Sequence, residues 1–220
     1  MTSLPPDWLD RIAGVPGRAR AQDLSRFVPP EDGGRPSAVL MLFSAGDDEA
    51  GAGPDVLLTE RAATMRSHPG QVSFPGGALE VDDDGPVDAA LREAAEETGL
   101  DRAGVDVLGQ LPSLFLPPSG FVVTPVLAQW RSPSRVAVVD EAEVARVVRA
   151  PLDELLDPAN RFVSRHPSGY LGPAFRVQGL YVWGFTAGLL SRLLAIAGLE
   201  RPWDHSRQED LPAEILALLP

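Results

Sequence analysis

The chain has 220 residues, and 44% of them are hydrophobic, which is enough for the core of one domain. Its formal net charge of −12 at pH 7 argues against sequence-independent nucleic-acid binding, which depends on Lys and Arg contacts to phosphates. The lack of cysteine excludes disulfide bonds and thiolate chemistry, and the three histidines show no zinc-binding spacing.

The first predicted elements are a short helix and two strands. Residues 1–37 form an extension with a helix around residues 8–12 and Pro- and Gly-rich connections. Residues 1–10 contain no basic segment followed by an apolar one, so we expect no signal peptide and a cytoplasmic location. The apolar runs 38–43 and 56–59 indicate buried strands that pair antiparallel. The polar segment 61–75 then leads into a glycine turn.

A helix is predicted at about residues 87–98. Pro86 suits its first position, and Gly99 suits the position just after its end. Its predicted apolar face leaves the glutamates to project elsewhere and consists of Val87, Ala90, Leu91 and Ala94.

Three glutamates of this helix, Glu93, Glu96 and Glu97, are the most informative feature of the chain. Residues three and four positions apart share a helix face, so these carboxylates repel at a cost of about 0.2–0.5 kcal/mol per pair. They also lie near the helix C-terminus, where the dipole disfavours negative charge. A divalent cation would reverse this balance, since hard cations such as Mg²⁺ prefer carboxylate oxygens. An acidic helix exposed to solvent, the alternative, explains neither the spacing nor the charge placement.

The second half of the chain predicts several short strands and one apolar helix. Strands are expected at 105–111, 121–130, 143–149 and 179–183, and helices at 152–156 and 185–197. Ser191 and Arg192 interrupt the longest apolar run, which therefore fits a buried helix and not a membrane span. The tail, residues 201–220, is mostly polar and is expected to be loosely ordered. One α/β domain at 38–200 is the simplest account.

The glycine turn and the acidic helix together resemble the Nudix box. The matching residues are Gly77, an acid at Asp83 and the run from Arg92 to Leu100. The chain departs from the usual pattern by an Asp in place of Glu and by eight instead of seven residues before the arginine. The resemblance implies an α/β/α sandwich with a mixed β-sheet between helices, and an enzyme that hydrolyses a nucleoside diphosphate linked to another group.

The resemblance also implies a metal centre that binds Mg²⁺ or Mn²⁺ (magnesium or manganese), both of which accept oxygen ligands. Glu93 and Glu97 would be the main ligands, Glu96 would share a further ion, and the Gly77 carbonyl would reach a metal. Such ions neutralise phosphate charge and lower the pKa of an attacking water.

Two further catalytic residues follow from the same resemblance. Arg92 would hold a neighbouring glutamate through a charge-assisted hydrogen bond. Nudix enzymes often use a carboxylate outside the box as a base or extra metal ligand, and Glu143 is the candidate here, with Glu141 in reserve. The predicted catalytic residues are therefore Glu96, Glu97, Glu143 and Arg92.

A second motif, immediately upstream, narrows the substrate. Residues 57–62, then Arg66, Gly70 and the run 74–77, resemble the extra motif of Nudix coenzyme A pyrophosphatases. Arg61 and Arg66 would form a cationic rim for the 3′-phosphate, because arginine matches phosphate oxygens in geometry. The simpler alternative is that Arg61 pairs with a surface acid and that Arg66 structures the loop. Trp183 would stack on a ligand or belong to the core.

The sequence thus predicts hydrolysis of coenzyme A or acyl-CoA to 3′,5′-ADP and (acyl-)4′-phosphopantetheine. Two alternatives remain open: a Nudix hydrolase of ADP-ribose or other nucleoside diphosphate derivatives, and a catalytically silent Nudix domain that binds a nucleotide. A small molecule is the expected partner, without nucleic acid or membrane, and a homodimer is left open.

Overall fold

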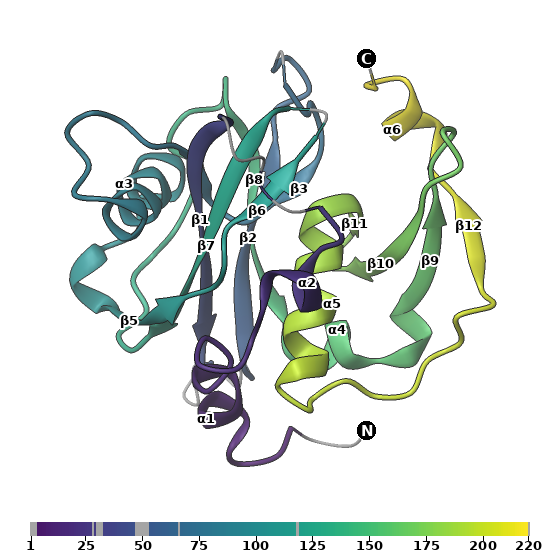
Figure 1. The fold of residues 1–220 in the computed structure, drawn as a ribbon, viewed down its shortest axis with the longest axis horizontal. Helices are drawn as coiled ribbons and strands as arrows, with labels where there is room; N and C mark the ends of the chain where they lie inside the picture. The colour runs from purple at the N-terminus through teal and green to yellow at the C-terminus, as the bar shows by residue number, and fades with distance from the viewer. Residues whose placement is uncertain are drawn as a thin grey trace.

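The structure is a computed structural model that describes residues 4–27, 29, 33–46, 53–65, 67–117 and 119–219. A large mixed β-sheet lies between helix α3 (Pro86–Thr98) on one face and helix α5 (Gly184–Ile196) on the other, as Figure 1 shows. A second, smaller sheet packs against the far side of α5. The predicted α/β/α sandwich is therefore confirmed, with one additional β layer.

The large sheet has eight strands among the described residues. They are β1 (Arg35–Ser44), β2 (Asp55–Arg61), β3 (Val72–Ser73), β4 (Gly76–Ala78), β5 (Val105–Gln110), β6 (Leu114–Leu116), β7 (Phe121–Trp130) and β8 (Val144–Pro151). Strands β1 and β7 are parallel along their whole length, whereas every other pairing in this sheet is antiparallel. The sheet is mixed, as predicted.

Strands β1 and β2 diverge soon after they pair. Their antiparallel register covers Phe43↔Val56 and Ser44↔Asp55, which confirms the predicted pair. Beyond that point β4 pairs with β1 and β3 pairs with β2. The peptide N–H of Leu40 donates to the carbonyl of Pro75 across 2.8 Å. The glycine turn therefore lies within the hydrogen-bonded sheet, in the gap between its two central strands.

Helix α3 begins and ends where its sequence signals place it. Pro86 occupies the first turn, and Gly99 ends the helix in the left-handed conformation at φ 71°. Three small buried residues, Ala89, Ala90 and Ala94, let the helix pack closely on the sheet. The sheet residues in this cluster include Leu40, Leu42, Leu57, Val126 and Ala128.

The larger core lies on the opposite face of the sheet. It buries residues of α5 against Met41, Phe43 and Leu58 of the two central strands. The layer is completed by α1 (Trp8–Ala13), α2 (Ala21–Leu24) and α4 (Leu152–Leu156), and the N-terminal extension contributes the buried Trp8 and Ile12. Within the described residues, no helix is long and apolar enough to cross a membrane.

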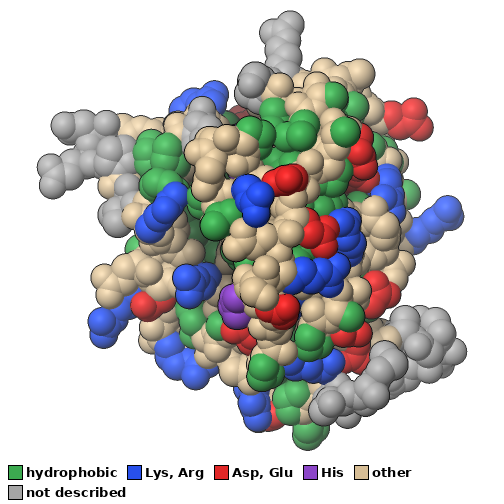
Figure 2. All heavy atoms as spheres, turned by 90° about the vertical axis from the view of Figure 1, so that its right-hand side faces the viewer, with side chains coloured by type: hydrophobic (Ala, Val, Ile, Leu, Met, Phe, Trp, Pro, Cys, Tyr) green, Lys and Arg blue, Asp and Glu red, His purple; other side chains and the backbone are tan. Residues whose placement is uncertain are grey.

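The second sheet has four strands among the described residues, and the sequence predicted one of them. Its strands are β9 (Arg161–Arg165), β10 (Leu171–Val177), β11 (Leu180–Val182) and β12 (Gln208–Asp210), and a short helix α6 (Ala213–Leu216) follows. Strand β11 confirms the strand predicted at 179–183, whereas β9, β10 and β12 were not predicted. The expectation of a loosely ordered tail is wrong, because β12 pairs in parallel with β9 and ion pairs join Glu209 to Arg176 and Arg207. Figure 2 shows basic and acidic side chains interspersed on this side of the molecule.

Candidate metal and active site

The glycine turn is packed directly against two glutamates of α3. The peptide N–H of Gly76 donates to Oε2 of Glu97 across 3.3 Å. A Cβ at Gly77 would lie 2.7 Å from Oε2 of Glu93, and a Cβ at Gly76 would lie 2.7 Å from the Cα of Val39. A side chain at position 76 would meet backbone atoms, and one at position 77 would displace the Glu93 carboxylate, so the glycine pair allows the turn and the two carboxylates to meet as they do.

Glu97 is buried, with 5% of its surface exposed. The expectation that all three glutamates project away from the packed face is therefore wrong for this residue. Burial raises the pKa of Glu97 to about 8, and the negative charges of Glu93 and Glu143 add to the rise. The positive charge of Arg61 and the Gly76 amide oppose it. A carboxylate in this environment is costly to ionise unless a cation is bound nearby.

Glu93 has the same environment in a weaker form. Burial raises its pKa, the neighbouring Arg92 lowers it, and the charges of Glu96 and Glu143 raise it further. Glu93, Glu97 and Glu143 are thus close enough to interact electrostatically, although they come from two separate parts of the chain. The Glu143 carbonyl accepts a hydrogen bond from the Ala62 amide at 2.8 Å, which fixes this segment beside the end of β2.

Arg92 joins the acidic loop to the helix. Its Nε and Nη2 donate to the two oxygens of Asp83 at 2.9 and 3.0 Å. Its Nη1 donates to Glu93 at 3.2 Å and to Glu96 at 2.9 Å. The hydrogen bonds from Arg92 to Asp83 lower the pKa of Asp83 to about 2. Asp83 therefore anchors the arginine that orients Glu93, a role that the sequence did not assign to it.

Glu96 differs from the other two glutamates of the helix. Its side chain is 58% exposed and is ion-paired with Arg92, whereas Glu97 is buried against the glycine turn. Glu97 is thus buried, Glu93 is half-buried, and Glu96 is exposed to solvent.

The donor set fits a hard divalent cation. Among the described residues, no three acidic or histidine side chains converge into a complete cage. Mg²⁺ does not need one, because it commonly keeps several waters and takes one or two carboxylates together with substrate phosphates. Glu93 and Glu97 offer such a partial set, and a bound cation would relieve the repulsion and burial that oppose the ionisation of Glu97.

Of the two arginines predicted from the upstream motif, Arg61 is the one that the structure describes, and its charge acts on Glu97. It ends strand β2, and its Nε donates to the Ser67 carbonyl at 3.4 Å. Arg66 lies outside the described residues. Trp183 is half-buried, and its ring stacks on His166 at a centroid distance of 5.9 Å.

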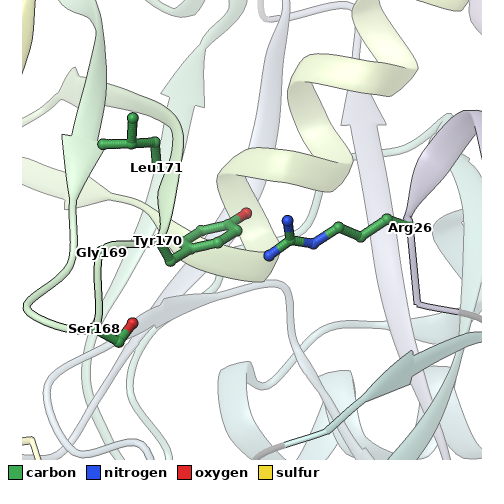
Figure 3. Close-up of a pocket in the computed structure, with 5 residues that line it drawn as sticks. All are labelled: Arg26, Ser168, Gly169, Tyr170 and Leu171. Atoms are coloured by element: carbon green, nitrogen blue, oxygen red, sulfur yellow. The ribbon is translucent and has the colours of Figure 1, made fainter.

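A surface depression of about 500 Å³ lies away from these residues, between the β9–β10 turn and the N-terminal segment. It is lined by Arg26, Ser168, Gly169, Tyr170 and Leu171, and Figure 3 shows the Arg26 guanidinium directed at the Tyr170 ring. None of the predicted site residues lines it.

Residues 34–168 match the family profile described as the NUDIX domain. The chain belongs to the Nudix hydrolase family. It is 42% identical to an uncharacterized Nudix hydrolase NudL of Cronobacter sakazakii over 156 residues, which cover 68% of this chain and 78% of the relative. It is 40% identical to the NudL of an Enterobacter species over 154 residues, 67% of this chain and 77% of the relative.

The fold comparison agrees with the family assignment. A Nudix hydrolase of M. smegmatis, RenU, aligns with a TM-score of 0.52 and 20% identity, covering 78% of this chain and 90% of its own. The predicted Nudix fold is confirmed by this likeness. Nudix hydrolases act on nucleoside diphosphate derivatives and generally use a divalent metal such as Mg²⁺.

Proposed function

We propose that this Nudix hydrolase cleaves the diphosphate bond of coenzyme A and its thioesters. The products are 3′,5′-ADP and 4′-phosphopantetheine, which keeps the acyl group when a thioester is cleaved. The observation that carries the proposal is the position of Arg61, whose charge acts on the buried carboxylate Glu97. A cation from the coenzyme A motif therefore stands beside the carboxylates that hold the metal, where a substrate rich in phosphate needs it.

Each residue of the cluster has a role that follows from its contacts. Glu93 and Glu97 would hold Mg²⁺ or Mn²⁺, and the ion would neutralise the charge of the diphosphate and lower the pKa of the attacking water. Arg92 keeps Glu93 and Glu96 in place through its hydrogen bonds. Gly77 leaves the space in which the Glu93 carboxylate lies.

The proton of the attacking water needs an acceptor. Glu143 is the candidate, because it lies outside the helix, is exposed, and acts electrostatically on both Glu93 and Glu97. Glu96, which is exposed, would hold a further ion. The water attacks one phosphorus, and the other phosphate leaves with its half of the substrate.

A comparison of substrates tests the proposal. Coenzyme A, acetyl-CoA, dephospho-coenzyme A and ADP-ribose are incubated with the enzyme in Mg²⁺ or Mn²⁺, and the products are separated by chromatography. We expect coenzyme A to have the highest kcat/KM. Removal of only the 3′-phosphate, as in dephospho-coenzyme A, should lower it about tenfold, an effect of one charge-assisted contact. Good turnover of ADP-ribose without turnover of coenzyme A would reject the substrate.

The Arg61→Gln variant shows whether the preference depends on this arginine. Its kcat/KM for coenzyme A should fall toward that for dephospho-coenzyme A, whereas its value for dephospho-coenzyme A should change little. Arg35→Gln is a matched control, because Arg35 begins β1 and its guanidinium lies 4.1 Å from the Phe121 ring, among contacts that include no predicted site residue. An equal loss on both substrates in Arg61→Gln would mean that Arg61 serves the metal centre and not the 3′-phosphate.

A catalytically silent domain is separated from an enzyme by Glu97→Gln. An enzyme loses turnover in this variant, whereas a binding module has no turnover to lose and keeps its affinity for the nucleotide.

A further inference from the structure

The tail of the chain is firmly held where it leaves α5. Arg161 of β9 is fully buried, and its Nη2 lies 2.7 Å from Oγ of Ser191 and 2.8 Å from Oε1 of Glu200. The ring of Trp203 lies 4.6 Å from the same guanidinium. Strand β12 then continues the second sheet, and Leu211 is buried just after it. The beginning of the tail is therefore a fixed part of the fold.

The end of the tail is different, since the residues of α6 are mostly exposed and a leucine just beyond the helix, Leu218, packs on another segment. Leu218 lies against Gly70, where an added Cβ would be 2.5 Å from the Leu218 Cδ1. Gly70 has φ +65°, a conformation that favours glycine. Figure 1 places α6 at the upper end of the second sheet. Leu218 thus occupies the space that a side chain at position 70 would fill.

Gly70 belongs to a short turn, residues 67–71, that holds Arg61. The Arg61 amide donates to the Gln71 carbonyl at 3.0 Å, and its Nε donates to the Ser67 carbonyl at 3.4 Å. Both the backbone and the side chain of Arg61 are therefore bound to this turn. A contact chain runs from Leu218 through the turn to Arg61, whose charge acts on Glu97.

We propose that Leu218 is a positioning residue for Arg61. By packing on Gly70 it holds the 67–71 turn, and with it the arginine that receives the substrate phosphate. Leu218 lies beyond residues 34–168, which match the NUDIX domain. The residue that supports the Arg61 turn therefore comes from outside the region that matches the family profile. The inference depends on the proposed function only for the identity of the phosphate that Arg61 binds.

The test compares Leu218→Ala with Leu216→Ala, a matched control from the same tail. Leu216 is 38% exposed. With the best substrate among coenzyme A, dephospho-coenzyme A and ADP-ribose, Leu218→Ala should raise KM about three- to tenfold and leave kcat within about twofold, the pattern of lost binding without lost chemistry. Leu218→Met should restore KM, and Leu216→Ala should leave it unchanged. In the Arg61→Gln background, Leu218→Ala should have no further effect on KM.

Hydrogen exchange gives a readout that needs no substrate. In Leu218→Ala, the amides of Arg61 and Gln71 should exchange several times faster than in the parent protein, whereas amides of α3 should not change. The inference is overturned if Leu218→Ala behaves like Leu216→Ala in both KM and exchange, or if its effect on KM adds fully to that of Arg61→Gln. Failure of coenzyme A as a substrate would refute the proposed function and leave this comparison intact.

Discussion

The burial of Glu97 predicts that the ionised form of this carboxylate destabilises the metal-free protein. The pKa of this group rises from 4.5 to about 8 in the folded protein. The folded protein binds the proton of Glu97 more tightly than the unfolded chain does. Protonated Glu97 therefore makes its full contribution to the stability of the fold below pH 4.5, and this contribution is lost as pH rises through 8. At 1.36 kcal/mol per pKa unit, the full shift corresponds to about 5 kcal/mol, and relaxation around the charge reduces this to roughly 2–4 kcal/mol.

Glu97→Gln removes the charge and keeps an oxygen that can accept the Gly76 N–H. In EDTA at pH 8.5 to 9 the variant should therefore be more stable than the parent by about 2–4 kcal/mol, or roughly 5–15 °C in melting temperature. At pH 4.5 the two proteins should melt within about 2 °C of each other, because the parent is then protonated. Thermal denaturation followed by circular dichroism measures both values.

Two further measurements, the effect of Mg²⁺ on the melting temperature and the rate of turnover, complete the experiment. Mg²⁺ should raise the melting temperature of the parent at pH 8.5 and have little effect on Glu97→Gln, and turnover by the variant should fall at least about 100-fold. Glu96→Gln is the control for charge removal, since that side chain is 58% exposed and its loss should change stability little. If Glu97→Gln is no more stable than the parent at high pH without metal, the carboxylate is not costly to bury and the reasoning fails.

Three further predictions concern the groups around this carboxylate. Gly77→Ala places a Cβ against the Glu93 carboxylate, so it should weaken Mg²⁺ binding about tenfold or more in titration calorimetry and destabilise the fold by about 1–3 kcal/mol; unchanged affinity would show that Glu93 is not a ligand. Asp83→Asn removes the anchor of Arg92, so the melting temperature of the variant should fall below that of the parent at pH 7. This difference should narrow as pH drops from 3.8 toward 2, because a carboxylate with a lowered pKa contributes stability above this range and loses it within the range. A difference that stays constant down to pH 2 would contradict this role. Gly70→Ala displaces Leu218 and should reproduce the rise in KM of Leu218→Ala, and a normal KM would separate the two residues.

Local signals predicted the elements that depend on local physics. Pro86 and Gly99 fix the ends of α3 because each matches a backbone conformation required at that position. The strand predicted at 121–130 matches β7, whose buried residues form a nearly continuous apolar run. Strands β3, β4 and β6 are two or three residues long, and they exist because a neighbouring strand offers hydrogen bonds. No local sequence pattern predicts these short strands.

The second sheet depends on contacts between distant segments. Strand β9 contains the buried Arg161, which forms an ion pair with Glu200 from far along the chain, and β10 contains Pro173. Both residues weaken the strand signal in the sequence. Strand β12 follows a polar stretch and is held by its pairing with β9, so its order could not be predicted from composition.

The sequence indicated which residues to expect at the candidate site but not how deeply each of them is buried. Glu97 follows Ala90 and Ala94 by seven and three positions, so helical periodicity places it on the packed stripe. Its charge favours the outer face instead, and the sequence does not show that the glycine turn covers it. The nearness of Arg61 to Glu97 depends on how β2 and α3 pack against the glycine turn, and no spacing in the sequence encodes it.

The divergence of β1 and β2 gives the candidate metal site and the proposed substrate-binding arginine separate supports. The glycine turn that faces the carboxylates is hydrogen-bonded to β1, whereas Arg61 ends β2 and is hydrogen-bonded to the turn that Leu218 contacts. One part can therefore be exchanged without the other. A chimera that replaces residues 61–71 with those of another family member should change which anhydride is cut and leave the ion requirement as it was.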